Sequence, residues 1–395
     1  MLSIKSKAIS PSPTLAIDSK FKEMKANGED VVGFGCGEPD FDTPQHIKDA
    51  AIAAINNGMT KYTPAAGTLE LRKAVAKKFK DENGLDYAPT DIVISNGAKH
   101  SLVNAFMAIL NPGDEVIVPA PFWVSYPEMI KLADGMPVII NTTEENNFKA
   151  SVEDFKKAFT PKTKAIVLNS PSNPTGMVYT KDELLKIADF AVKHNIYVIS
   201  DEIYEHLIYE GEHISIASFN EKIKDLTIVV NGVSKTYAMT GWRIGFTASN
   251  SEIAKIMANV QSHASSNPNS IAQAATVAAL LGDKKDVEIM KKHFVERRNY
   301  MVDTINSIEG VSCKKPQGAF YIMMSIEGLI GKTLYGKIIN NADDFAEIFL
   351  EKAKVAVVPG TGFGSPNYVR WSYATSMENI VEGLERLKKL LDEKY

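Results

Sequence analysis

The chain has 395 residues, of which 45% are hydrophobic and 23% are charged, and its formal net charge at pH 7 is −4. This length exceeds the size at which one hydrophobic core usually stops growing, so we expect two domains. The composition is that of a folded globular protein. The near balance of charges excludes the basic surface expected of a protein that binds nucleic acid or an anionic membrane.

The two cysteines, Cys36 and Cys313, are too few for a disulfide framework and form no CxxC pair. The first residues, MLSIKSKAISPSPTLAID, contain no apolar core long enough for a signal peptide. No stretch approaches the roughly 20 apolar residues that a membrane-spanning helix needs. The sequence therefore predicts a cytoplasmic protein without a membrane partner.

From about residue 45, helical segments alternate with short apolar runs, which is typical of a mostly parallel sheet covered by helices on both faces. Expected strands are 91–95, 114–120, 164–170, 195–202, 226–232 and 243–249, and expected amphipathic helices include 181–195 and 251–264. Active sites in such sheets collect at the carboxyl ends of the strands. We therefore look for catalytic residues there.

After a long polar helix expected near 284–307, the pattern changes to short strand-like segments, a helix near 342–353 and a final amphipathic helix. This change predicts a smaller α+β domain. The expected division is an N-terminal segment, 1–44, that packs with the small domain, a large domain, 45–295, and a small C-terminal domain, 296–395. No Ser/Gly linker is visible, so we expect closely packed domains with a cleft between them.

The segment NGVSKTYAMTGWRIG (231–245) places Lys235 at the end of an apolar strand, with Arg243 eight residues further on. A lysine at such a strand end can be partly desolvated, which lowers its pKa and frees the neutral amine for imine formation. Arginine offers a planar fork that matches two oxygens of a phosphate. Taken alone, Lys235 would be expected to be a solvated loop lysine, as most lysines are.

Two further strand ends carry polar residues. Asn173 lies in a turn bracketed by prolines, so its side chain can be held in place to donate to a phenolate oxygen. Asp201 ends another apolar strand, and Tyr204 follows it. A buried carboxylate needs a cationic partner, and a protonated pyridine nitrogen is such a partner. Taken singly, Asn173 is also compatible with a plain turn and Asp201 with a helix N-cap.

Nine segments in the same order make the chain resemble the class I aminotransferases of the fold-type I superfamily, which depends on pyridoxal 5′-phosphate (PLP). More narrowly, it resembles the bacterial and archaeal branch of the aspartate aminotransferases, over essentially the whole length. The segments are GEPDFDTP (37–44), KYTPAAGTLELR (61–72), SNGAKH (95–100), PAPFWVSYPEM (119–129), NSPSNPTG (169–176), SDEIYEHLIYEGE (200–212), SKTYAMTGWRIG (234–245), GAFY (318–321) and VRWSYA (369–374). The resemblance implies an α/β protein of the PLP-dependent transferase fold type I, with a large domain built on a mostly parallel sheet and a smaller α+β domain.

The resemblance implies that Lys235 carries PLP as a Schiff base and later moves a proton between the α-carbon of the amino acid and the cofactor. It implies that Asp201 pairs with the pyridinium nitrogen, so that the ring acts as an electron sink. Asn173 and Tyr204 resemble the pair that hydrogen-bonds the phenolate oxygen, and Trp123 resembles the aromatic residue that stacks on the ring.

For the cofactor phosphate, the segment SNGAKH resembles a strand-to-helix turn in which the N–H groups of Gly97 and Ala98 bind an anion. The family adds Arg243 to this site. It also implies that Tyr62 reaches the phosphate from the neighbouring subunit, which requires a homodimer with shared active sites.

One position departs from the family pattern. Many relatives carry Ser or Thr three residues before the lysine, whereas this chain has Gly232 there and Ser234 directly before Lys235. Ser234 is therefore a phosphate-binding candidate that the resemblance supports less well than the others.

Arg370 matches the family residue that grips the α-carboxylate of the substrate, and Gly37 and Asn173 help to frame the same group. Bidentate pairing would orient the substrate so that its Cα–H bond stands perpendicular to the ring. The donor and the acceptor would use one pocket in turn, which implies a ping-pong mechanism.

The substrate is less clearly indicated than the reaction. A dicarboxylic substrate needs a second cation, yet no arginine occurs between Arg243 and Arg297. In the branch that the chain resembles, a lysine takes this role, which here is Lys99, with Thr14 as a hydroxyl partner. Lys99 could instead bind the cofactor phosphate. Transfer from L-aspartate to 2-oxoglutarate is the first expectation, and alanine, aromatic, prephenate or broad specificity are alternatives.

Other functional classes fit the sequence less well than an aminotransferase. The segment GFGCGEPD (33–40) has the spacing GxGxG and no following helix start, which argues against a dinucleotide site. The seven histidines show no metal-ligand spacing, and GxSxG is absent. A PLP-dependent C–S β-lyase and a non-catalytic PLP-fold regulator stay open as alternatives to an aminotransferase.

Overall fold

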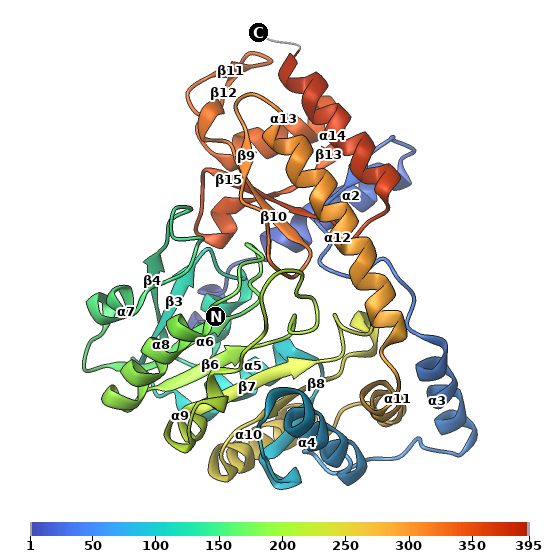
Figure 1. The fold of residues 1–395 in the computed structure, drawn as a ribbon, viewed down its shortest axis with the longest axis vertical. Helices are drawn as coiled ribbons and strands as arrows, with labels where there is room; N and C mark the ends of the chain where they lie inside the picture. Colours follow the sequence, from blue (N-terminus) through green and yellow to red (C-terminus); the bar gives the residue numbers. More distant parts are fainter. Residues whose placement is uncertain (1, 393–395) are drawn as a thin grey trace.

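The computed structural model describes residues 2–392, and Figure 1 shows two lobes. The large lobe is built on a seven-stranded sheet with the order β2–β8–β7–β6–β5–β3–β4. Only β8 in this sheet runs antiparallel to its neighbours. The strands are β2 (Ile92–Ser95), β3 (Glu115–Ala120), β4 (Met136–Asn141), β5 (Thr163–Asn169), β6 (Tyr197–Asp201), β7 (Thr227–Gly232) and β8 (Gly245–Ala248).

Six of these strands were expected from the sequence, and their observed ends lie within two residues of the expected ones. The exception is β4, for which no strand was predicted. This strand lies at the edge of the sheet and its side chains are exposed or half-buried. Its sequence MPVIIN is largely apolar, but Pro137 lies within the run, and a proline weakens a strand pattern because it has no amide hydrogen to donate.

Helices cover both faces of the large sheet. Alternate strand residues such as Val116 and Val118 pack with α5 (Ala98–Ile109), α6 (Ser125–Leu132) and α10 (Ser251–Ala264). The residues between them, such as Ile117, pack with α7 (Val152–Ala158), α8 (Lys181–His194) and α9 (Glu221–Leu226). This two-sided burial confirms the predicted α/β sheet.

Local capping sets the ends of these helices. At the start of α8, the Thr180 hydroxyl accepts from the amide of Glu183, and the Glu183 carboxylate accepts from the amide of Thr180. The same helix ends at Asn195, whose φ of 51° is left-handed. This is the capping box and left-handed end expected for a helix of this sequence.

The small lobe contains an antiparallel sheet with the order β14–β15–β10–β9. Its strands are β9 (Ser312–Cys313), β10 (Tyr321–Ser325), β14 (Val358–Pro359) and β15 (Tyr368–Ser372), and its helices are α12 (Lys285–Asn306), α13 (Ala342–Ala353) and α14 (Met377–Asp392). The short strand β1 (Val32–Gly33) pairs with β13 (Val355–Ala356), which ties the N-terminal segment to this lobe. The predicted domain boundaries at 44 and 295 stay a prediction.

The remaining elements complete the surface of both lobes. They are α1 (Ile4–Lys7), α2 (Pro13–Ala26), α3 (Gln45–Asn56), α4 (Leu69–Asn83), α11 (Ser270–Leu281), β11 (Thr333–Leu334) and β12 (Lys337–Ile338), with short 3₁₀ turns at 89–91, 216–218, 240–242, 327–329 and 360–363. Within residues 2–392, no helix combines the length and the apolar character needed to cross a membrane.

Candidate active site

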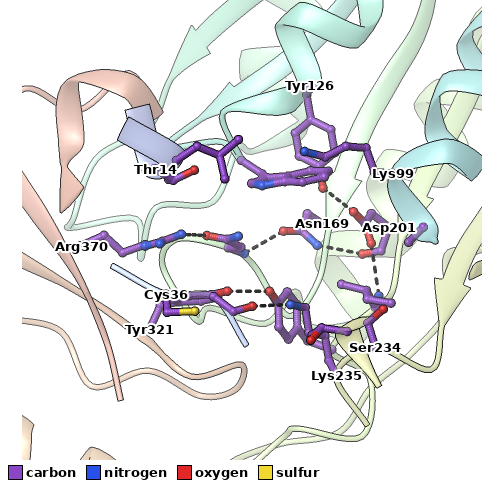
Figure 2. Close-up of a pocket in the computed structure, with 18 of the residues that line it drawn as sticks. Thr14, Cys36, Lys99, Tyr126, Asn169, Asp201, Ser234, Lys235, Tyr321 and Arg370 are labelled. Carbon is purple, nitrogen blue, oxygen red and sulfur yellow. Dashed lines mark hydrogen bonds between the residues drawn. The ribbon is translucent and has the colours of Figure 1, made fainter. Parts of the chain in front are cut away.

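A cavity of about 320 Å³ lies where the carboxyl ends of β5, β6 and β7 meet the small lobe (Figure 2). Its walls come from the N-terminal segment, the start of α5, these strand ends, and strands β10 and β15. Twelve residues predicted for the site line it: Thr14, Gly37, Ala98, Lys99, Trp123, Asn173, Asp201, Tyr204, Ser234, Lys235, Arg243 and Arg370. Residues scattered over most of the chain therefore meet in one place.

Lys235 lies just beyond the end of β7, and its amine donates a hydrogen bond to the carbonyl of Gly37. Burial lowers the pKa of this amine to about 8; Arg370 and Arg243 add to the effect, whereas Cys36 and Glu38 oppose it. A substantial fraction of the amine is therefore neutral near physiological pH and able to attack a carbonyl.

Asp201 ends β6 and is 3% exposed. One carboxylate oxygen accepts from the hydroxyl of Tyr126 at 2.7 Å, and the other accepts from the amide of Ile203 at 3.2 Å. Burial raises the pKa of Asp201 to about 6, although the Tyr126 hydroxyl and the charge of Lys235 both lower it. Among residues 2–392, no Lys, Arg or His side chain forms an ion pair with this carboxylate.

The polar groups next to Asp201 fix the two strand ends to each other. The side-chain amide of Asn169, at the end of β5, donates to the Asp201 carbonyl at 3.0 Å. The Asn169 oxygen accepts from the backbone amide of Asn173 at 2.7 Å. These contacts orient the turn that carries Asn173 into the cavity.

Two tyrosines cross the cavity between the lobes. The hydroxyl groups of Tyr204 and Tyr321 share a hydrogen bond at 2.9 Å, and both residues are buried. Burial raises the pKa of Tyr204 well above its usual value, and the neighbouring Tyr321 adds to this. Both phenols therefore stay protonated and can donate to an anionic oxygen.

Arg370, on β15, is 2% exposed. Its guanidinium donates to the side-chain oxygen of Asn173 at 3.1 Å and to the Gly35 carbonyl at 2.8 Å, and it lies over the Tyr321 ring at 4.5 Å. Its Nε is buried without a hydrogen-bond partner among the described residues. A buried guanidinium that no carboxylate neutralises is suited to an anionic ligand.

The start of α5 forms a second anionic subsite. Gly97 precedes the helix with a φ of 87°, and Ala98 is its first residue. A side chain at Gly97 would collide with the guanidinium of Arg243, which donates to the Thr240 carbonyl at 2.8 Å. The Gly97 amide donates to the Ser95 carbonyl at 2.8 Å, so of the two predicted amides that of Ala98, beside the guanidinium, is the one placed to bind a phosphate. Gly97 itself does not line the cavity, although the next residue, Ala98, does.

Lys99 and Trp123 stand together on one wall. The Lys99 amine lies 4.9 Å from the centre of the Trp123 ring. Burial lowers the pKa of Lys99, and the charge of Arg243 adds to this effect. Thr14, near the start of α2, lines the same cavity, and its hydroxyl shares a hydrogen bond with Ser12 at 2.9 Å.

For two of the predicted phosphate-binding residues, Ser234 and Tyr62, no hydrogen bond within the described part of the chain indicates a role in the cavity. Ser234 lines the cavity and is 7% exposed. Tyr62 does not line the cavity of its own chain, and 90% of it is exposed. Its predicted role needs a second subunit and stays a prediction.

Sequence reasoning did not assign roles to several residues of the site. Tyr126, Asn169, Tyr321, Cys36 and Thr240 all line the cavity. Tyr126, Asn169 and Tyr321 lie inside three of the segments that carry the family resemblance, so the signal was present. Their roles depend on side-chain partners distant in sequence, such as Asp201 for Tyr126.

The comparisons with known proteins agree with this geometry. The chain matches the family "Aminotransferase class I and II" over residues 29–387. It is 49% identical over 386 residues to the aspartate aminotransferase of Bacillus subtilis (strain 168), covering 98% of this chain and 97% of that protein. It is 46% identical over 394 residues to the aspartate/prephenate aminotransferase of Nitrosomonas europaea, covering 99% of each.

Solved structures show the same similarity. The aspartate aminotransferase from Rhizobium meliloti superposes with a TM-score of 0.97 at 42% identity, with 100% of both chains covered. The Thermus thermophilus aspartate aminotransferase with maleate gives a TM-score of 0.94 at 44% identity, with 99% of this chain and 100% of that chain covered. The fold and the cavity define a PLP-dependent transferase of fold type I. The chain belongs to the class I and II aminotransferases, and its cofactor is pyridoxal 5′-phosphate.

Proposed function

We propose that this protein transfers the amino group of L-aspartate, or of a similar amino acid, to 2-oxoglutarate by ping-pong chemistry, with Lys235 as the residue that carries PLP. One observation carries the proposal: an amine with a pKa of about 8 shares a cavity with the buried, unpaired carboxylate of Asp201 and the buried guanidinium of Arg370. The similar proteins from Bacillus subtilis and Rhizobium meliloti are named aspartate aminotransferases.

The residues present fit PLP at each end of the molecule. Asp201 offers a buried negative charge for the ring nitrogen, and the start of α5 with Arg243 offers donors for the phosphate. Trp123 and the buried hydroxyl of Tyr204 would contact the ring and its phenolate oxygen. When bound, the cofactor supplies the electron sink that weakens the Cα–H bond of the amino acid.

Lys235 has two roles in this proposal. Its neutral amine would hold the cofactor covalently, and the same amine would act as the base that takes the α-proton of the bound amino acid and later gives it back. The carbonyl of Gly37, which accepts from this amine, holds the freed group near the reacting atoms. General base catalysis of this kind typically contributes 10²–10⁴-fold.

Arg370 would bind the α-carboxylate of the substrate. The Asn173 side chain and the Gly35 carbonyl fix the plane of its guanidinium, so its remaining donors are aimed before the substrate arrives. A fixed fork orients the substrate at low entropic cost, which favours cleavage of the Cα–H bond.

Lys99 would bind the side-chain carboxylate of a dicarboxylic substrate, with Thr14 beside it. Support comes from its place on the cavity wall over Trp123 and from the Thermus thermophilus structure, which is described with maleate, a dicarboxylate. Prephenate, a 2-oxo acid, is an alternative amino-group acceptor, since a similar protein from Nitrosomonas europaea is named an aspartate/prephenate aminotransferase.

We further propose a homodimer in which Tyr62 enters the partner's site. The exposed Tyr62 and a group of exposed apolar side chains on α3 and α11, which pack side by side, support this: Ile52, Ile55 and Leu281. A cytoplasmic location and the division into 1–44, 45–295 and 296–395 belong to the same proposal. Light scattering across a range of concentrations checks the dimer, and a Tyr62→Phe variant with weaker PLP binding would support its shared site.

The test is a panel of donors with and without 2-oxoglutarate, applied to the parent and to Lys99→Ala. The parent should form oxaloacetate from aspartate over many turnovers only with the acceptor present, and at most one equivalent per active site without it. Lys99→Ala should lose about 10- to 100-fold in kcat/KM for aspartate and glutamate, because a hydrogen bond to a charged group contributes roughly 1.5–3 kcal/mol.

Alanine and phenylalanine serve as matched controls because they have no second carboxylate. Equal losses for all four donors would assign Lys99 to the cofactor phosphate instead. Pyruvate and ammonia released from cysteine conjugates without an acceptor would indicate a C–S lyase and contradict the proposal.

A further inference from the structure

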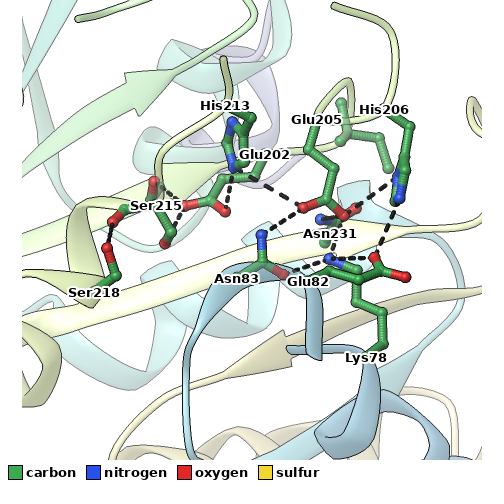
Figure 3. Close-up of polar contacts among 12 residues, drawn as sticks. Lys78, Glu82, Asn83, Glu202, Glu205, His206, His213, Ser215, Ser218 and Asn231 are labelled. Carbon is green, nitrogen blue, oxygen red and sulfur yellow. Dashed lines mark hydrogen bonds and ion pairs between the residues drawn. The ribbon is translucent and has the colours of Figure 1, made fainter. Parts of the chain in front are cut away.

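A buried polar cluster lies close to the ends of β6 and β7 (Figure 3), and none of its labelled members lines the active-site cavity. It joins α4, the segment that follows β6, and the end of β7. Lys78 is 4% exposed, Glu205 is 8% exposed, and Glu202 and Asn231 are each 1% exposed. Burying such groups is costly unless each is fully bonded, so their partners identify what they hold together.

The carboxylate of Glu205 is the centre of the cluster. It forms an ion pair with the Lys78 amine, and it accepts from the side-chain amide of Asn83 at 2.8 Å and from that of Asn231 at 2.7 Å. Burial would raise the pKa of Glu205, but Lys78 and two nearby histidines outweigh burial and hold the pKa well below its usual range. Glu205 therefore stays ionised throughout the physiological range.

The link to Asn231 connects the two segments that carry the chemistry. Glu205 lies four residues after Asp201, and Asn231 lies four residues before Lys235. The Asn231 side chain also accepts from the backbone amide of Gly232 at 2.7 Å, which orients the chain as it leaves β7.

The backbone ladder does not hold these segments. Strands β6 and β7 pair in parallel up to Asp201 and Val230, with one further bond from the Glu202 amide to the Val230 carbonyl at 2.9 Å. Beyond that point, no backbone hydrogen bond joins the segment leading to Tyr204 with the segment leading to Lys235 among the described residues. Where the backbone pairing of β6 and β7 ends, the two segments are joined by hydrogen bonds between side chains, such as that from Asn231 to Glu205.

A second link joins the same segments one step further on. The ring of His206 shares a hydrogen bond at 3.3 Å with the hydroxyl of Thr236, the residue after Lys235. The other nitrogen of this ring faces Glu82 at 3.1 Å. Two side-chain bridges therefore span from the segment after Asp201 to the segment around Lys235.

We propose that Glu205 and Asn231 are positioning residues: their hydrogen bond, with Lys78 neutralising the carboxylate, fixes the distance between Asp201 and the Lys235 amine. The inference rests on the proposed function, because it assigns the network a task at that same site. A cluster that only stabilised the fold would need no bridge between these two segments.

The experiment compares Asn231→Ala with Glu205→Gln in the PLP-loaded enzyme. Asn231→Ala removes the bridge and keeps the Lys78–Glu205 ion pair, whereas Glu205→Gln removes the charge and keeps an amide oxygen that can accept from Asn231. Asn231→Ala should lose on the order of 100-fold in kcat with little change in KM, since a misplacement of about 1 Å can cost that much. It should also shift the pH midpoint of the bound-cofactor absorbance.

Glu205→Gln should show the opposite ranking, with the larger fall in melting temperature and the smaller loss in kcat. The control is Arg298→Met, which removes a side chain that is 3% exposed and ion-paired with Glu210 at 3.1 Å, outside the cavity. This control should lower the melting temperature and leave kcat and the absorbance midpoint as in the parent.

Losses in kcat that follow melting temperature across all three variants would overturn the inference, and so would parental kcat and absorbance for Asn231→Ala. If Asn231→Ala does not fold, Thr236→Val breaks the second bridge with an equal-sized side chain and should cost roughly 10-fold in kcat; parental behaviour would then overturn the inference. A parent that bound PLP but converted no amino acid would contradict the proposed function instead.

Discussion

Two buried carboxylates four residues apart have opposite electrostatic environments. Asp201 faces the cavity with no cation paired to it, and burial raises its pKa to about 6. Glu205 faces the interior, where Lys78 and two asparagines surround it and its pKa is held well below the usual range. The structural carboxylate of Glu205 is neutralised within the protein, whereas the carboxylate of Asp201 has no cationic partner among residues 2–392 and is available to a ligand.

The same contrast applies to the lysines. Lys78 is neutralised by Glu205, whereas burial lowers the pKa of Lys235 to about 8 in the cavity. An unpaired buried charge costs stability, so its presence at one site and absence at the other separates binding groups from structural groups. Substitutions of these buried residues test this separation.

The largest effect should come from Lys235→Ala. The variant loses both the covalent attachment of the cofactor and the base that removes the α-proton, so kcat should fall by about 10⁴-fold or more. Half-reaction kinetics with aspartate measure the loss, and circular dichroism verifies the fold. Near-parental turnover in a folded variant would remove the mechanism.

Asp201→Asn should cost on the order of 10²–10³-fold in kcat, the size typical of removing one preorganised electrostatic partner. It should also raise the melting temperature of the PLP-free protein at pH 7.5. The folded pKa of about 6 exceeds the unfolded value of 3.8, so the folded state binds more protons between these values and stability falls as pH rises through them. The loss of folding stability caused by the ionised Asp201 is nearly complete about one pH unit above 6, so it is present at pH 7.5.

Glu205→Gln should shift the melting temperature in the opposite direction from Asp201→Asn. The substitution removes the nearer of two carboxylates from the buried Lys78 amine and leaves that of Glu82 at 3.7 Å, so the PLP-free variant should melt below the parent. The contrast between the two carboxylates would break if both substitutions shifted the melting temperature in the same direction.

Tyr126→Phe should have a smaller effect, about 10-fold in kcat. The substitution removes the 2.7 Å hydrogen bond that Asp201 accepts, which costs about 1–2 kcal/mol and raises the pKa of the carboxylate further. The lower limb of the kcat/KM profile should therefore move to higher pH. Lost activity with an unmoved limb would show that Tyr126 only supports packing.

The smallest effect concerns the rate of cofactor capture. The amine of Lys235 must be neutral to react, and its neutral fraction grows as pH rises through about 8. Stopped-flow mixing of PLP with the PLP-free enzyme should therefore give a rate that increases with pH and levels off above that value. A midpoint near 10.5 would indicate a solvated lysine.

Strand ends in the sequence predicted Lys235, Asp201 and Asn173 correctly as neighbours, because the carboxyl ends of parallel strands share one edge of a sheet. The resemblance to the family predicted further site residues such as Arg370, whose position in the cavity does not follow from the periodicity of apolar residues along the sequence. Together they predicted most of the fold and of the cavity lining.

The rest depends on contacts that a sequence does not display. The sequence indicates only that Tyr126 is a core residue of a helix. The structure shows that its hydroxyl lies 2.7 Å from the Asp201 carboxylate. The bridge from Glu205 to Asn231 joins residues 26 positions apart, and neither residue has a local pattern that indicates it. The edge strand β4 escaped prediction because its apolar run MPVIIN contains Pro137, which weakens a strand pattern.

The central claim is that Lys235 holds the cofactor opposite Asp201. Borohydride reduction of the PLP-loaded enzyme, followed by proteolysis and mass spectrometry, tests this attachment directly. The account predicts one reduced pyridoxyl adduct, on the peptide that contains Lys235. An adduct on another lysine such as Lys99, or no adduct in an enzyme that shows bound PLP, would contradict it.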